Sequence, residues 1–249
     1  MPYRLILIVL SIAAWAPSSA RADALGDVLD RMVATYGGEE NLRKLDSMVQ
    51  EWDLLALMRN QQGTDKRSIR LAGQLRVELT YPNKLETRLL DGDTAYAVFD
   101  ARDPAPASDM QRAAMRLQLM RFYSPLTLHD RRDSLSLSEG DGHVVLSLRE
   151  GNLQTDYVVS TESWHIVKTV GRLAMNGAAM QFVTEYSEFS KIDGVLVHHR
   201  ENKFVGGMNT AVLRLKRIEV DAELGDSEFA PRKNRTDPVI ARIEGTSAL

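Results

Sequence analysis

The sequence predicts a mainly β fold of the α+β class, in which antiparallel strands form the bulk of one domain. Apolar and polar residues alternate with a period of two along most of the chain, which is typical of strands with one buried face. Short turn signals, such as Asp91-Gly92-Asp93 and Asn176-Gly177, separate successive apolar runs. Strands at such short spacing favour an antiparallel meander, because parallel strands need long crossover connections.

The N-terminal segment has the order of a secretory signal peptide. Arg4 precedes a largely apolar run over residues 5–16, and small residues follow it. The run is shorter than the roughly 20 apolar residues that cross a bilayer. Ala20-Arg21-Ala22 predicts cleavage before Asp23, which makes residues 1–22 the signal peptide; a cut two residues later and an uncleaved anchor are the alternatives. We therefore expect an exported, soluble, periplasmic protein.

The composition excludes several classes of site and partner. The 249 residues include no cysteine, which excludes disulfides, thiolate metal sites and a lipidated N-terminal cysteine. Acidic and basic residues are mixed along the chain, with a net charge of −3 and no basic block that would bind phosphates. Nucleic acid is therefore not expected as a partner. The length that remains after cleavage suits one domain with a substantial core.

Helices are expected before the first strand. Apolar residues recur every three or four positions from Leu25 to Tyr36, as on one face of an amphipathic helix. Gly37-Gly38 ends this helix, since glycine readily adopts the left-handed conformation past a helix end. Residues 39–45 can form a second short helix.

Strands are expected from Met48 onward, where the period of the apolar residues changes to two. The alternation is clearest from Leu75 to Tyr81, where Arg76, Glu78 and Thr80 face the other side. The remaining expected strands cover residues 48–58, 85–90, 94–99, 143–148, 154–160, 165–173, 178–189, 195–205 and 210–220.

One helical segment, at about residues 107–122, interrupts the strands. Its apolar stripe is rich in methionine, a flexible side chain that packs against irregular or changing surfaces. This segment is either a mobile lid over a cavity or an ordinary helix that closes one face of the sheet. After Pro231 the sequence becomes polar and loses its period, so residues 232–249 are expected to form a loosely held tail.

No catalytic or metal-binding motif is present in the sequence. The five histidines are scattered, and the adjacent His198 and His199 should point to opposite faces of a strand. The sequence has no H-E-x-x-H zinc motif, nucleophile elbow, P-loop or dinucleotide-binding motif. We therefore expect no enzyme activity, no metal and no cofactor; an exported enzyme with an unrecognised site is the alternative.

Three stretches of the sequence have recognisable features. The first runs from Tyr36 to Leu45 and consists of a helix end, a glycine pair and a short helix. The second runs from Glu185 to His199 and contains an Asp-Gly-Val turn, with Val197 at a position where proline is frequent. The third, from Leu213 to Pro231, is similar to a closing strand with a D-x-x-F-x-P ending.

In this order, the three stretches resemble the LolA/LolB-like superfamily of outer-membrane lipoprotein-sorting proteins. This resemblance implies a fold and a function for residues 23–231. The fold would be a LolA-like half-barrel, a curved antiparallel sheet that forms an incomplete β-barrel capped by helices. The function would be that of a periplasmic carrier that binds a lipid or an acylated protein in outer-membrane biogenesis. Its further partner would be a donor or acceptor protein in the inner or outer membrane. An envelope sensor with the same fold and a structural envelope component are the alternatives.

Alternation along the strands and the helical stripe together predict which side chains line the cavity that the resemblance implies. A solid core is the alternative, because most apolar side chains that alternate in this way fill the interior. The expected lining residues are Trp52, Leu54, Met58, Leu75, Val77, Leu79, Tyr81, Met110, Leu117 and Met120.

Overall fold

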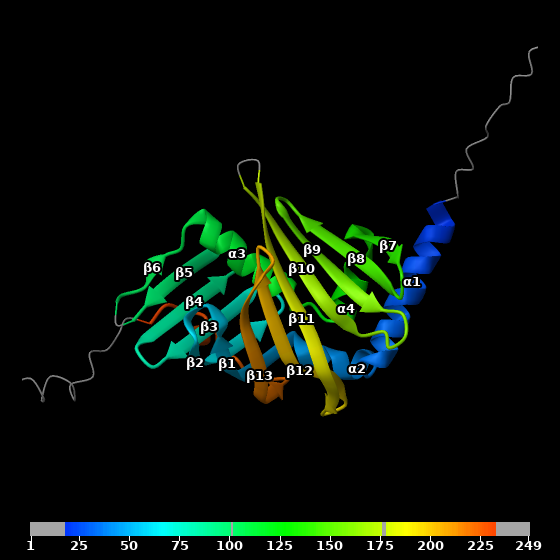
Figure 1. Cartoon of the computed structure of the whole chain (residues 1–249). Coiled ribbons are helices and arrows are strands. Elements are labelled where there is room, and N and C mark those ends of the chain that lie inside the picture. Colours follow the sequence, from blue (N-terminus) through cyan, green and yellow to red (C-terminus); the bar gives the residue numbers. More distant parts are fainter. Residues whose placement is uncertain (1–17, 101, 176–177, 233–249) are drawn as a thin grey trace, which may run out of the picture.

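The computed structural model describes residues 18–100, 102–175 and 178–232, and these form a large antiparallel sheet with a few helices (Figure 1). The sheet has thirteen strands in the order β6-β5-β4-β3-β2-β1-β13-β12-β11-β10-β9-β8-β7. Its edges, β6 and β7, do not pair with each other, so the sheet is not closed. The predicted fold class, mainly β with an incomplete barrel, is confirmed.

The strands range from the two-residue β6 to the fifteen-residue β11, and most follow one another through short turns, whereas helices separate β6 from β7. Their bounds are β1 (Ser47–Ala56), β2 (Gln61–Arg70), β3 (Gln74–Tyr81), β4 (Lys84–Asp91), β5 (Thr94–Phe99), β6 (Ala105–Pro106), β7 (Leu135–Gly140), β8 (His143–Glu150), β9 (Leu153–Ser160), β10 (Ile166–Met175), β11 (Ala178–Ile192), β12 (Val195–Val205) and β13 (Met208–Val220).

Four α-helices and four short 3-10 helices complete the described chain. They are α1 (Ser18–Thr35), α2 (Glu39–Leu42), α3 (Asp109–Met120), α4 (Pro125–Asp130), η1 (Arg43–Asp46), η2 (Leu57–Arg59), η3 (Arg132–Ser134) and η4 (Asp226–Glu228). None of these helices is long and apolar enough to cross a membrane. Most of the predicted signal peptide, and all but Arg232 of the predicted tail, lie outside the described residues.

The sheet curves around α3, which lies inside its concave face (Figure 1). α3 contacts β3, β4 and β5 near one edge of the sheet and also β9 and β10 near the other. One helix can reach both groups of strands only because the sheet bends towards itself. Ser108 precedes α3 and forms a capping box with Gln111. The Ser108 hydroxyl accepts a hydrogen bond from the Gln111 backbone N–H, and the Gln111 side-chain oxygen accepts one from the Ser108 backbone N–H.

The main core lies between the concave face and the helices. Leu29 and Met32 of α1, Leu117 of α3 and Leu128 of α4 are completely buried in this core. Tyr157 of β9 donates from its hydroxyl to the Met120 carbonyl at 2.5 Å, which holds the C-terminal end of α3 to the sheet.

The three stretches that carry the family resemblance meet at one junction. The Leu196 backbone donates to the Tyr36 carbonyl at 3.0 Å, and Lys44 donates to the Asp193 carbonyl at 3.2 Å. The third stretch joins them, because the Asp221 backbone donates to the Lys44 carbonyl at 2.7 Å. The three segments that carry the resemblance are therefore in contact with one another in the folded protein.

Several elements differ from the sequence-based expectation. β1 ends at Ala56, so Met58 belongs to η2, and Asn60 then adopts a left-handed conformation that turns the chain into β2. β2, β6, β7 and α4 were not expected. β2 was missed because its inward positions include the charged residues Asp65 and Arg67, which break the apolar alternation.

Candidate ligand-binding cavity

A cavity of about 530 Å³ lies between the concave face of the sheet and α3. This volume falls within the range of roughly 300–1,000 Å³ that is common for small-molecule sites. Most of its lining is apolar and comes from strands on both sides of β1. The apolar lining residues are Leu54, Ala56, Met58, Val77, Leu79, Tyr81, Ala97, Phe99, Ala114, Met115, Phe182, Val183, Phe204, Val205, Ala211 and Leu213.

The strand register explains why these side chains converge. Paired residues of antiparallel neighbours point to the same face of a sheet. Asp65 of β2 pairs with both Trp52 of β1 and Leu79 of β3, and Leu79 pairs with Glu86 of β4. These four residues therefore form one row that crosses the sheet on its inward face. Every second residue along each strand points to that same face.

The predicted lining residues divide into two groups. Leu54, Met58, Val77, Leu79 and Tyr81 line the cavity. Their role in ligand binding stays a prediction.

The other five predicted residues lie outside this cavity, and their role in ligand binding also stays a prediction. Leu75, Leu117 and Met120 are packed in the main core, and Trp52 is fully buried in a polar network beside the cavity. Met110 is 47% exposed.

The orientation of α3 accounts for the difference. Leu117 packs against Gly171 of β10, where the absence of a side chain leaves room for it. The helix therefore directs Leu117 and Met120 into the core and presents a neighbouring face to the cavity. That face consists of Gln111, Ala114, Met115 and Gln118.

Exposed apolar side chains gather at the outer end of the cavity. Leu57 and Met58 follow the end of β1, Leu85 follows the β3–β4 turn and Met208 follows the β12–β13 turn. These turns lie on the same side of the sheet, because Ala56 at the end of β1 pairs with Ala211 near the start of β13. We call this exposed end of the cavity its mouth; of these four side chains Met58 lines the cavity, together with the exposed Arg59.

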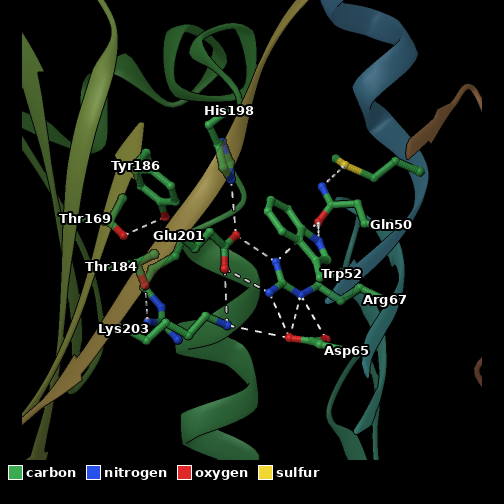
Figure 2. A network of polar contacts seen from close by, with 12 residues as sticks. Gln50, Trp52, Asp65, Arg67, Thr169, Thr184, Tyr186, His198, Glu201 and Lys203 are labelled. Atoms are coloured by element: carbon green, nitrogen blue, oxygen red, sulfur yellow. Dashed lines mark hydrogen bonds and ion pairs between the residues drawn. The ribbon is translucent and has the colours of Figure 1, made fainter. Parts of the chain in front are cut away.

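A buried polar network lies beside the cavity, and Arg67 is its centre (Figure 2). Arg67 donates to Asp65 at 2.8 Å and to the two carboxylate oxygens of Glu201 at 2.8 and 2.9 Å. Lys203 lies 3.3 Å from Glu201 and 3.7 Å from Asp65. These two cations and two carboxylates balance each other, which lowers the cost of burying Asp65, Arg67 and Glu201, while the Lys203 side chain is 25% exposed.

The pKa shifts in the network follow from this pairing. Burial alone would lower the pKa of Arg67, but the carboxylates of Asp65 and Glu201 outweigh it and raise the pKa. Burial alone would raise the pKa of Glu201, but Arg67, Lys203 and His198 hold it well below its usual range. Glu201 is therefore a carboxylate at neutral pH.

Aromatic residues enclose the network. The Trp52 ring stacks on His198 with centroids 5.5 Å apart, and the Arg67 guanidinium lies 4.9 Å from the centre of the Trp52 ring. His198 lies 3.2 Å from Glu201, whereas His199 contacts Ser190, so the two histidines have separate partners. Burial raises the pKa of Tyr186 to about 12, and its hydroxyl lies 2.9 Å from that of Thr169.

Arg121, the residue that follows α3, is one of the polar residues that line the cavity. Its guanidinium donates to the Thr184 hydroxyl at 3.3 Å and lies 5.8 Å from the centre of the Phe182 ring. Sequence inspection singled out none of Asp65, Arg67, Arg121, Glu201 and Lys203. Within the described part of the chain, no group of three or more His, Cys, Asp or Glu residues is arranged to hold a metal ion.

The sequence and the structure were compared with those of known proteins. No protein-family model matches the sequence, and no curated protein matches it. A LolA superfamily protein from Nitrosomonas europaea superposes with a TM-score of 0.51 at 13% identity, over 84% of this chain and 97% of that one. At this identity the likeness shows the fold alone.

Two further structures are less similar, over the same shares of both chains. A domain classed with the outer membrane lipoprotein-sorting proteins, from Vibrio parahaemolyticus, has a TM-score of 0.49 at 8% identity. A DUF1329 family protein from Desulfovibrio piger has a TM-score of 0.46 at 12% identity.

Proposed function

We propose that this chain, which has the LolA-like fold, is a carrier that binds the acyl chain of a lipid or of an acylated protein. The cavity of about 530 Å³ under α3 is the observation that carries this proposal. Its apolar lining includes Leu54, Val77 and Leu79 on the sheet and Met115 on the helix. No covalent step is required, because retention would depend on the exclusion of water from the chain.

The energetics of chain burial suit a carrier. Each CH₂ group moved from water into an apolar site contributes about 0.8 kcal/mol, so even part of an acyl chain would be held firmly. Release then requires a competing site of higher affinity or a change that opens the cavity. The exposed methionines Met58 and Met208 at the mouth suit contacts with variable partners, since methionine is flexible and polarizable.

The proposed setting is the periplasm, with a membrane donor or acceptor protein as the second partner. The order of charges and apolar residues in the N-terminal segment supports export. We assign the carrier domain to residues 23–231, with the α3 segment at about 107–122 as the element that closes the cavity. The ten residues predicted from the sequence remain candidates, and Leu54, Met58, Val77, Leu79 and Tyr81 are favoured because they line the cavity.

Native mass spectrometry of the gently purified protein, followed by lipid extraction, tests the proposal. The expected result is a stoichiometric acyl-containing adduct, or uptake of one fluorescent fatty acyl probe per chain by the delipidated protein. The methyl ester of the probe should be included, so that binding of the chain is measured without a charged group. A clean apo mass, together with no uptake of the acid, the ester or a fluorescent phospholipid, contradicts the carrier function.

A further inference from the structure

Arg121 is a cation at the boundary between two hollow regions. It lines the large cavity and also a smaller pocket of about 80 Å³ on the side of Tyr36 and Tyr186. Arg121 contacts Phe182 and Thr184, which lie further along β11 than the exposed Met180.

The guanidinium of Arg121 has unused hydrogen-bonding capacity. Within residues 18–100, 102–175 and 178–232, its only hydrogen bond to a side chain is the one to Thr184, and its buried Nε has no partner. Among the described residues, no carboxylate lies within ion-pair distance of it. An unpartnered buried donor is rare, because it loses its bonds to water without replacement.

The nearby carboxylates are already engaged by other cations. Asp65 and Glu201 are bound by Arg67 and Lys203, which match them in number. Arg121 therefore adds one positive charge that the buried network does not balance. The pKa shifts agree with this difference, because burial lowers the pKa of Arg121 whereas the carboxylates raise the pKa of Arg67. Both groups stay protonated, since arginine does not lose its proton in proteins.

We propose that Arg121 binds the anionic oxygen headgroup of an amphiphile, a carboxylate or a phosphate, while the acyl chain fills the apolar part of the cavity. This assignment rests on the proposed function and deepens it, because it names the class of lipid. The guanidinium presents its donors in a planar fork that suits carboxylate and phosphate oxygens. Lys203 also lines the cavity, but Asp65 and Glu201 engage its charge, so Arg121 is the cation assigned to the headgroup.

The chemistry of the headgroup can be tested without changing the protein. A fluorescent fatty acid and its methyl ester have the same chain and differ in one negative charge. We expect the acid to bind at least about tenfold more tightly than the ester, since a hydrogen bond to a charged group contributes more than a neutral one. Acetate and inorganic phosphate at millimolar concentration distinguish a free anion from a headgroup, and we expect neither to displace the acid.

Variants then locate the site of charge recognition. Arg121→Gln should remove the preference for the acid and leave the affinity for the ester unchanged, and Arg121→Lys should retain part of the preference. Arg88→Gln is the matched control, because Arg88 also lines the cavity but is paired with Glu86 at 2.6 Å. This control should keep the full preference. Thermal unfolding of each variant establishes that it is folded.

The outcomes separate this inference from the carrier function. Equal binding of acid and ester by the unmodified protein overturns the inference and leaves the carrier function intact. A preference for the acid that persists in Arg121→Gln overturns the assignment to Arg121, and displacement by acetate or phosphate alone shows a site for free anions instead. If the acid, the ester and the fluorescent phospholipid all fail to bind and the purified protein has a clean apo mass, the carrier function itself is wrong.

Discussion

A Cβ atom placed on Gly37 would lie 2.1 Å from the carbonyl oxygen of Gly194, so the backbones of these two glycines are in direct contact. Gly37 ends the first helical segment, and Gly194 lies in the tight turn between β11 and β12. Their contact joins two of the three stretches that resemble the LolA/LolB-like superfamily. Glycine at position 37 is therefore required for packing against Gly194 as well as for ending a helix.

Replacing Gly37 with alanine should destabilise the fold severely. The new methyl group would overlap a backbone oxygen, which cannot move aside as a side chain can, and Gly37 also has a positive φ of 118°. We expect the free energy of unfolding to fall by more than about 4 kcal/mol, an exceptional loss for one substitution. Urea unfolding of the purified variant measures it.

Gly38→Ala is the control for backbone strain alone. Gly38 has a positive φ of 83°, but a Cβ there would meet no atom within 4 Å. Its cost should be about 1–3 kcal/mol, the range for a residue held in an unfavourable backbone region. Equal losses in the two variants would show that the contact with Gly194 is not the cause.

A second glycine sets the position of α3. A Cβ on Gly171 would lie 3.0 Å from Cδ2 and Cγ of Leu117, which is tighter than ordinary contact. Gly171→Ala should therefore push α3 away from β10 and lower the free energy of unfolding by about 1–3 kcal/mol, as overpacked cores do. Gly26→Ala in α1 is the control, since a Cβ there meets no atom within 4 Å and alanine favours a helix.

The same displacement should loosen the cavity. If α3 acts as a lid, Gly171→Ala should speed the release of a bound acyl probe, measured by stopped-flow transfer to vesicles. Release at the unmodified rate, from a variant that has lost stability, would assign α3 to the structural core only.

The sheet could be predicted well from the sequence where its inward residues are apolar. β3 is the clearest case, because Leu75 and Val77 are buried and lie on the same face. β2 was missed for the opposite reason, since its inward face includes Asp65 and Arg67. Glu201 accompanies them on a distant strand, 134 residues from Arg67, so no local pattern reveals that the charges are balanced.

The candidate site could be predicted only in part. The strand residues Leu54, Val77 and Leu79 follow from alternation, but the rotation of α3 does not. That rotation depends on the space above Gly171, which only the tertiary structure reveals. One local signal was present: Glu201 and Lys203 are oppositely charged and two residues apart in an expected strand, so they share a face.

Glu201→Gln should destabilise the protein most at neutral pH. The buried Arg67 would lose one of its two carboxylates, and breaking such a pair costs about 3–5 kcal/mol. The folded state lowers the pKa of Glu201 below its ordinary value of 4.5, so the carboxylate stabilises the fold above about pH 4.5. This contribution is lost as the pH falls towards the lower pKa of the folded state.

The penalty for Glu201→Gln should therefore be larger at pH 7 than at pH 3, as measured by urea unfolding at both values. Glu188→Gln is the control, because Glu188 is an exposed carboxylate that pairs with Arg200 and Arg214 at 3.5 and 3.4 Å. Surface pairs of this kind contribute about 0–1 kcal/mol. A penalty for Glu201→Gln that is the same at both pH values would contradict the role assigned to its charge.

Filling the cavity from α3 should block acyl binding without unfolding the protein. Ala114 lines the cavity, so Ala114→Trp would place an indole in the space that the acyl chain needs. We expect the affinity for both the fluorescent acid and its methyl ester to fall at least about tenfold, because chain burial contributes to the binding of both probes. Thermal unfolding should change little, since the new ring enters space that no side chain occupies.

Arg112→Trp is the control, because Arg112 on the same helix does not line the cavity and pairs with Asp109 at the surface. Unchanged binding by Ala114→Trp would place the acyl chain outside this cavity, and an equal loss in Arg112→Trp would attribute the effect to the helix as a whole.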